Sequence, residues 1–161
     1  VRVTHNLKRT KLNAKVVTAN ALGWEPDGDD KTFTHVLVDA PCSATGTIRR
    51  HPDIPHLKST SDLAKLVMQQ EKLLAKAADL TAPGGTLVYC TCSLQPEEGE
   101  QRIEKFLAAN PAFERSPITK ADLPGLEEAV TPLGDMRTLP TFWATQGGMD
   151  GFFAARLKRA V

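Results

Sequence analysis

Two short stretches of this sequence place a thiol where a buried strand is expected to end. In the first, Asp39, Pro41 and Cys42 follow the apolar run Val36-Leu37-Val38. This order predicts a carboxylate, a proline that fixes φ and a thiol at the carboxyl edge of a sheet, where open α/β sheets bind their ligands. The alternative is an ordinary strand-to-helix connection in which the cysteine is buried and packs as a small hydrophobic residue.

The second stretch runs from Thr86 to Ser93 and contains Cys90 and Cys92. It is rich in apolar and β-branched residues, which is typical of a strand. Pro96-Glu97-Glu98 follows, and a proline with nearby carboxylates favours the first turn of a helix. Cys92 is therefore also expected at a strand end, and two parallel strands would bring it to the crevice that holds the first thiol.

Hydrophobic periodicity predicts the elements that position these strand ends. Residues 61–80 repeat apolar side chains at three- and four-residue steps, which predicts a helix that covers one face of the sheet. Residues 96–109 predict a second helix. Residues 137–140 and 151–157 predict a closing antiparallel pair, whose last strand packs a phenylalanine into the core.

The N-terminal residues predict a helix over about 1–13 and a short strand over Val16–Ala19, which ends at Asn20. The helix begins without a capping residue, so we expect the chain to continue upstream. Asn20 has two open interpretations. Its amide oxygen could accept a hydrogen bond from a ligand, or the residue could simply form a turn after the strand.

The 161 residues are the size of one domain, and 41% hydrophobic with 24% charged residues is typical of a globular protein. We expect a cytoplasmic protein with no membrane partner, because no apolar run approaches the roughly 20 residues that span a bilayer and the opening residues do not resemble a signal peptide. Three cysteines, two of them separated by one residue, do not suggest a disulfide framework. The formal net charge of +1 gives no strong overall field that would attract nucleic acid.

One basic cluster follows the first thiol and contains Arg49, Arg50, His51 and Lys58. Cations beside a cleft can neutralise phosphates, and arginine or histidine planes can stack on unpaired bases. A solvated charged loop is the alternative, but the position next to Cys42 favours contacts with a nucleic acid such as RNA.

We predict no metal site. Cys90, Cys92 and a nearby histidine would form an unusual zinc set, because one residue separates these cysteines where zinc sites usually have two or more. Cys90 is instead expected to be a buried core residue.

The chain resembles the Sun/Fmu family of AdoMet-dependent RNA (cytosine-5) methyltransferases. Three motifs carry the resemblance, in the family's order: Asp39-Ala40-Pro41-Cys42, Tyr89-Cys90-Thr91-Cys92-Ser93-Leu94-Gln95-Pro96-Glu97-Glu98 and Asp150-Gly151-Phe152-Phe153. The resemblance covers most of residues 1–161, as the C-terminal portion of the family's catalytic domain.

The resemblance implies an α/β fold, the Rossmann-like sheet of class I methyltransferases, with helices on both faces and strand order 3-2-1-4-5-7-6. It implies S-adenosyl-L-methionine (AdoMet) as cofactor and RNA as substrate, with ribosomal RNA the commonest among bacterial relatives. The family's first two strands and Gly-rich loop would precede this chain. We therefore expect a missing N-terminal segment of the same protein to complete the sheet, and we expect the fragment alone to bind AdoMet very weakly.

The resemblance also implies a role for each motif residue. Cys92 would be the nucleophile that adds to carbon 6 of cytosine, Asp39 would contact the base and the cofactor, and Cys42 would assist release of the methylated product. AdoMet would contact Asn20, Asp39 and Pro41.

Two alternatives remain open. DNA cytosine-5 methyltransferases use the cysteine of a Pro-Cys pair as nucleophile, and Pro41-Cys42 is such a pair. The other alternative is a non-catalytic RNA-binding or interaction module that keeps the scaffold, although intact Cys42, Cys92 and Asp39 favour an enzyme.

Overall fold

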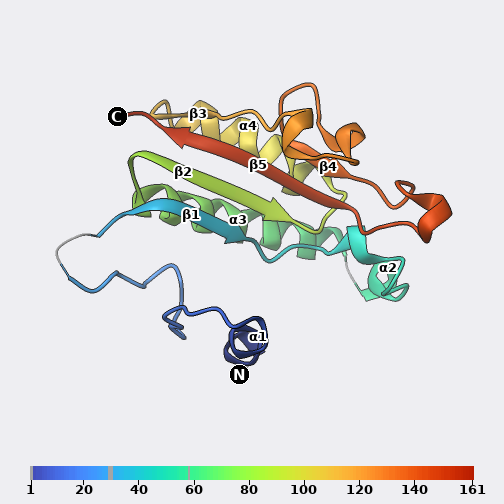
Figure 1. Ribbon diagram of the computed structural model, residues 1–161, viewed down its shortest axis with the longest axis horizontal. Coiled ribbons are helices and arrows are strands. Elements are labelled where there is room, and N and C mark those ends of the chain that lie inside the picture. Colours follow the sequence, from blue (N-terminus) through green and yellow to red (C-terminus); the bar gives the residue numbers. More distant parts are fainter. Residues whose placement is uncertain (1, 29–30, 58) are drawn as a thin grey trace.

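The computed structural model describes residues 2–28, 31–57 and 59–161, and a five-stranded mixed sheet forms its centre (Figure 1). Strand β1 (Phe33–Asp39) pairs in parallel with β2 (Thr81–Thr91), and β2 pairs antiparallel with β5 (Phe152–Arg159). The other edge of β5 pairs with two short strands, β3 (Phe113–Arg115) and β4 (Met136–Thr138).

The order β1-β2-β5-β3 is the one expected for strands 4, 5, 7 and 6 of the methyltransferase sheet, with β5 antiparallel to its neighbours. The predicted α/β class and the closing antiparallel pair are therefore confirmed. Because β1 and β2 run in parallel, the residues that follow Asp39 and Thr91 emerge at the same edge of the sheet.

Two long helices pack on one face of the sheet. α3 (Thr60–Leu80) begins with a capping box at Ser59 and contacts both β1 and β2. α4 (Glu100–Ala109) follows a 3-10 turn over Pro96–Glu98 and packs beside α3. Both predicted helices are confirmed. Within the described residues, however, they share a face, so the expected cover of both faces is seen on one face only.

The core lies between these helices and the sheet. Leu87 and Tyr89 of β2 and Phe153 and Leu157 of β5 have no exposed surface, and Leu74 of α3 packs in the same cluster. Along each strand these residues alternate with residues of the opposite face. A shift of one residue would turn the whole set away from the helices, so burial fixes the register of the strands.

The connections contain short elements that periodicity did not predict. An ion pair of 3.3 Å between Arg115 and the buried Asp135 holds β3 to the segment before β4. No helix among the described residues is long and apolar enough to cross a bilayer. The short helical elements are α2 (Ile54–Leu57) and 3-10 turns over Thr45–Thr47, Lys120–Asp122, Glu127–Ala129 and Ala144–Gln146.

The first part of the N-terminal segment 2–28, with α1, lies apart from the sheet (Figure 1), whereas its end contacts the core region, since Trp24 stacks on Phe33 and Glu25 pairs with Lys76. α1 (Arg2–Thr10) has no buried residue, and residues 12–28 have no regular structure. The predicted strand Val16–Ala19 is therefore wrong, and Val16 and Val17 are about half exposed. An extended segment is a strand only when a neighbouring ladder binds its N–H and C=O groups, and in the methyltransferase order two further strands would stand between this segment and β1.

Candidate active site

The carboxyl ends of β1 and β2 bring two thiols into contact. The Sγ atoms of Cys42 and Cys92 lie 3.4 Å apart, and both side chains are partly exposed. Cys42 comes from the loop after β1, and Cys92 is the first residue after β2. The prediction that cysteines from two strands meet at the carboxyl edge of the sheet is confirmed, and Cys42 is not the fully buried residue of the alternative interpretation.

The contact makes the two thiols unequal acids. With Cys42 as the donor, its hydrogen bond to the Cys92 sulfur lowers the pKa of Cys92 to about 7. The same contact, together with burial, raises the pKa of Cys42 well above its usual range. Near neutral pH a substantial share of Cys92 is therefore thiolate, the nucleophilic form, while Cys42 keeps its proton.

Asp39 and Cys90 lie side by side on neighbouring strands. The Cys90 Sγ is 3.9 Å from Oδ1 of Asp39 and 3.4 Å from the carbonyl oxygen of Val38. Cys90 is buried as predicted, and burial reinforced by the Asp39 charge raises its pKa to about 11. Asp39 itself is exposed, so its carboxylate is open to a ligand beside the thiols. Within the described residues, no three His, Cys, Asp or Glu side chains are grouped closely enough to hold a metal ion.

Three chain segments cross at Gly46. Its N–H donates to the Cys92 carbonyl oxygen at 3.0 Å, and its own carbonyl oxygen accepts from the Gly151 N–H at 2.8 Å. A Cβ at residue 46 would overlap the Gly151 carbonyl oxygen and lie 2.9 Å from that of Cys92, so the crossing requires glycine. The Asp-Gly-Phe-Phe motif thus supports the thiol loops as well as the core.

A buried carboxylate that the sequence analysis did not single out lies behind the thiols. Glu98 has no exposed surface, and it accepts hydrogen bonds from the backbone N–H of Ser43 at 3.0 Å and its hydroxyl at 2.5 Å, and from Nε2 of Gln70 at 2.8 Å. The sequence signal is the pair Glu97-Glu98, but two carboxylates after a proline predict only favourable charge at a helix terminus. Glu97 is exposed, and sequence alone does not tell which of the two glutamates points inward.

Three of the predicted RNA-contacting residues, Arg49, Arg50 and His51, are consecutive and exposed, and a carboxylate already binds two of them. Nη2 of Arg50 lies 2.5 Å from Oδ2 of Asp150, and Nη2 of Arg49 lies 3.7 Å from Oδ1 of the same side chain. The hydrogen bond from Arg50 lowers the pKa of Asp150. His51 is exposed, and Lys58 lies outside the described residues. Part of the positive charge of this loop is therefore neutralised within the chain.

The predicted AdoMet contacts are split between two places. Asp39 and Pro41 are exposed at the end of β1, beside the thiols. Asn20 belongs to the segment that lies apart from the sheet, and its Oδ1 accepts a hydrogen bond from the Leu22 N–H at 3.1 Å. In this chain Asn20 thus forms a turn, which is the alternative interpretation of this residue.

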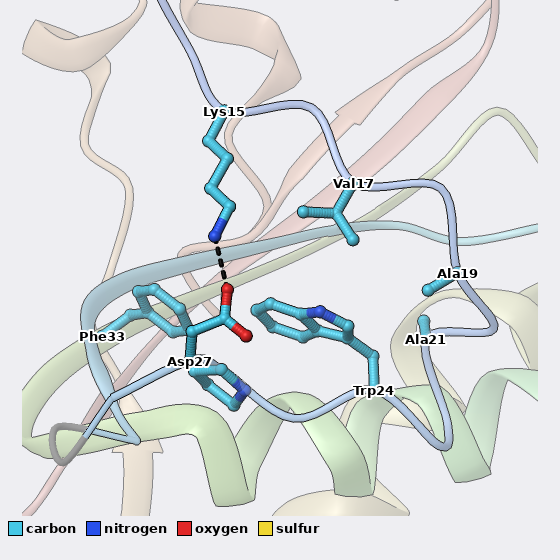
Figure 2. A pocket seen from close by; sticks show the side chains of 8 residues that line it. Lys15, Val17, Ala19, Ala21, Trp24, Asp27 and Phe33 are labelled. Carbon is cyan, nitrogen blue, oxygen red and sulfur yellow. Dashed lines mark hydrogen bonds and ion pairs between the residues drawn. The ribbon is translucent and has the colours of Figure 1, made fainter.

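A separate cavity of about 510 Å³ lies between the N-terminal segment and the start of β1 (Figure 2). Alternate residues of the stretch 15–21 face it, and the stacked rings of Trp24 and Phe33, with centroids 6.2 Å apart, form another wall. An ion pair of 2.5 Å between Lys15 and Asp27 closes one side. The thiols do not line this cavity, so it is distinct from the candidate active site.

Comparison with known proteins agrees with this arrangement. Ribosomal RNA small subunit methyltransferase B from Vibrio vulnificus is 43% identical over 132 residues, which cover 79% of this chain and 31% of that protein. The protein of the same name from Cronobacter sakazakii is 41% identical over 156 residues, which cover 97% of this chain and 33% of its own length. The chain thus spans about a third of the length of these relatives.

A solved structure and a family model extend the comparison. The crystal structure of PH0851 matches with a TM-score of 0.81 at 31% identity, covering 98% of this chain and 34% of that chain. The family model of the 16S rRNA methyltransferases RsmB/F matches residues 1–158. Because this match extends over nearly the whole sequence, the chain belongs to the 16S rRNA methyltransferase RsmB/F family.

Proposed function

We propose that this chain forms the C-terminal part of the catalytic domain of an RNA (cytosine-5) methyltransferase, which transfers a methyl group from AdoMet to carbon 5 of a cytosine in ribosomal RNA. The observation that carries the proposal is the 3.4 Å contact between the Cys42 and Cys92 sulfurs at the carboxyl ends of two parallel strands. The relatives are named as small-subunit ribosomal RNA methyltransferases, which supports this substrate class. The substrate and the three free thiols both fit a cytoplasmic location.

Carbon 5 of cytosine is a weak nucleophile, and a thiolate that adds to carbon 6 makes it reactive. Cys92 fits this task better than Cys42, because its pKa is lowered to about 7 while that of Cys42 is raised. The same difference in pKa disfavours the alternative in which Cys42, the cysteine of the Pro-Cys pair, is the nucleophile. No observation favours the alternative of a non-catalytic module, because Cys42 and Cys92 are both partly exposed and can reach a substrate.

The residues of the site divide this reaction between them. The Cys92 sulfur bonds to carbon 6, the double bond between carbons 5 and 6 opens and leaves an electron pair for carbon 5, and Asp39 holds the base at nitrogen 3. When bound, AdoMet supplies the methyl group that carbon 5 receives. A base then takes the proton from carbon 5, the electrons of that C–H bond re-form the double bond between carbons 5 and 6, and the electron pair of the carbon–sulfur bond returns to Cys92. Cys42, whose sulfur is 3.4 Å from that of Cys92, is placed to assist this release.

Asp39 and Pro41 suit one part of an AdoMet site. Both are exposed at the end of β1, and a carboxylate can accept hydrogen bonds from the amino groups of the cofactor. The target base would have to be unpaired or flipped out of a helix to reach the thiols. Phosphates of the RNA would compete with Asp150 for Arg49 and Arg50, while exposed His51 could stack on a neighbouring base.

RNA containing 5-fluorocytosine tests the chemistry, because fluorine blocks the proton loss that releases the enzyme. We expect the full-length parent protein to form a covalent adduct with such RNA through Cys92 in the presence of AdoMet. Cys92→Ala should abolish the adduct, and Cys90→Ala, a neighbouring buried thiol, serves as the matched control that retains it. An adduct mapped by mass spectrometry to Cys42 would instead support the DNA-enzyme arrangement.

We also propose that a further segment of the parent protein pairs with β1 and completes the sheet. β1 forms one edge of the sheet among the described residues, and Leu37 on it is 67% exposed. A cavity of about 510 Å³ lies between the stretch 15–21 and the start of β1 (Figure 2). Calorimetric titration should show AdoMet binding to the parent protein and very weak or no binding to this chain. Equal affinity for both would contradict the proposal.

A further inference from the structure

Glu98 is a carboxylate without exposed surface, and its hydrogen bonds come from neutral groups. A buried carboxylate is costly unless hydrogen bonds replace its lost hydration. One of its partners is Ser43, which contributes both its backbone N–H and its hydroxyl, and the other is the Gln70 amide. These four contacts involve both carboxylate oxygens. They fix the position of the Glu98 side chain and the positions of Ser43 and Gln70.

These contacts hold the chain on both sides of Cys42. The Ser43 N–H, immediately after Cys42, lies 3.0 and 3.2 Å from the two carboxylate oxygens of Glu98. Nε2 of Gln70 donates both to Glu98 at 2.8 Å and to the carbonyl oxygen of Pro41, immediately before Cys42, at 2.9 Å. Gln70 comes from α3, so the thiol loop is bound to the helix layer beneath it.

The same residue holds the chain on both sides of Cys92. The Thr91 hydroxyl donates to the backbone carbonyl oxygen of Glu98 at 3.3 Å. Oγ of Ser93 lies 3.0 Å from Oγ of Ser43, whose hydroxyl donates to the Glu98 side chain. Glu98 therefore links the neighbours of one thiol to the neighbours of the other.

We propose that Glu98 is a positioning residue that holds the Cys42 and Cys92 loops so that their sulfurs stay in hydrogen-bond contact. The inference rests on the proposed function for its catalytic consequence. Glu98 touches neither sulfur, and it acts through the peptides around them. Without it, Ser43 and Gln70 lose their common acceptor, the two loops separate, and Cys92 loses the hydrogen bond that stabilises its thiolate.

Glu98→Gln in the full-length parent protein tests this. An amide oxygen at the Oε1 position still accepts from the Ser43 N–H and from Gln70, but an NH2 group at the Oε2 position no longer accepts from the Ser43 hydroxyl. The negative charge that strengthens these hydrogen bonds is also lost. We expect alkylation of Cys92 by iodoacetamide near neutral pH to slow by about tenfold, with its pH midpoint shifted upward. Methyl transfer should lose kcat while KM for RNA stays unchanged. Glu97→Gln, the exposed neighbour, is the matched control and should alter none of these.

A second variant keeps the proposal testable if Glu98→Gln fails to fold. Ser43→Ala removes the hydroxyl donor but keeps the backbone N–H, so it should move the alkylation midpoint in the same direction by a smaller amount. Folded variants whose Cys92 midpoint equals that of the unmodified protein would overturn the positioning role. A parent protein that methylates no RNA would refute the proposed function. The positioning role of Glu98 would still be tested, because alkylation of Cys92 requires no methyl transfer.

Discussion

Residues 33–161 and the N-terminal segment 2–28 contain similar apolar residues but differ in what surrounds them. In the first region, Phe153 and Leu87 have no exposed surface and every strand has a partner. In the second, α1 buries nothing and Val17 is about half exposed. The thiol side of the site is therefore assembled within this chain, whereas Asn20, predicted to contact the cofactor, lies on a segment that makes no strand. The two regions differ in how their apolar side chains are packed, and not in their residue types.

The largest expected effect breaks the packed region. Phe153→Ala removes a fully buried ring from the core between β5 and the helices, and it should lower the free energy of unfolding of this chain by about 3–5 kcal/mol. Urea denaturation followed by circular dichroism measures the loss. A cost below about 1 kcal/mol would mean that the core is far looser than the burial of Phe153 indicates.

Two glycines allow a matched test of crowding in the two regions. Gly46→Ala would place a methyl group against the carbonyl groups of Gly151 and Cys92, and forcing these segments apart should cost about 1–3 kcal/mol. Gly23→Ala in the N-terminal segment meets nothing within 4 Å and should change stability by less than about 0.5 kcal/mol. Thermal denaturation of both variants checks the difference, and equal melting temperatures would show that the crossing at Gly46 is not tight.

The sequence was informative where a pattern spans many residues. Apolar steps over 61–80 fixed α3 within one residue, and the two apolar runs before Cys42 and Cys92 located the strand ends that meet. Each of these patterns depends on a long element with one buried face, which local periodicity reflects directly.

The sequence was uninformative where tertiary contacts decide the local structure. Val16–Ala19 has strand-forming residues but no ladder partner among the described residues, so it is not a strand. Glu97 and Glu98 are the same residue type in adjacent positions, yet one is exposed and the other is the centre of a buried network. Asp135 is likewise buried and forms an ion pair with Arg115, in a region where no hydrophobic periodicity predicts its burial.

The acidity of Cys92 tests whether the thiols act as one unit. Its pKa in the folded chain, about 7, is lowered from an ordinary value of 9.0, chiefly by the hydrogen bond with Cys42. A lowered pKa means that this thiolate contributes stability above the unfolded-state pKa, and the contribution is lost as the pH falls through about 7. Because the thiolate is the form that reacts, the rate of Cys92 alkylation should be half-maximal near pH 7. Cys42→Ala should move this midpoint upward by about one pH unit or more.

Cys90→Ala is the control for that shift, because the Cys90 thiol contacts Val38 and Asp39 and has no hydrogen bond with Cys92, so the midpoint should stay in place. Mass spectrometry of the alkylated peptides assigns each rate to its cysteine. If Cys42→Ala leaves the midpoint near 7, the acidity of Cys92 arises from its backbone surroundings and not from the partner thiol.

The smallest effect sharpens the comparison between the regions most directly. Val17→Ala removes two methyl groups from a side chain that is about half exposed, so in this chain it should change the free energy of unfolding by less than about 0.5 kcal/mol. In the full-length parent protein, where we propose that further strands fill the space between this segment and β1, the same substitution should cost about 1 kcal/mol or more, because Val17 would then be buried in the sheet. Denaturation of both proteins, each with and without the substitution, gives the two values. Equal costs would show that the N-terminal segment stays unpacked in the parent protein, and AdoMet would then need contacts other than Asn20.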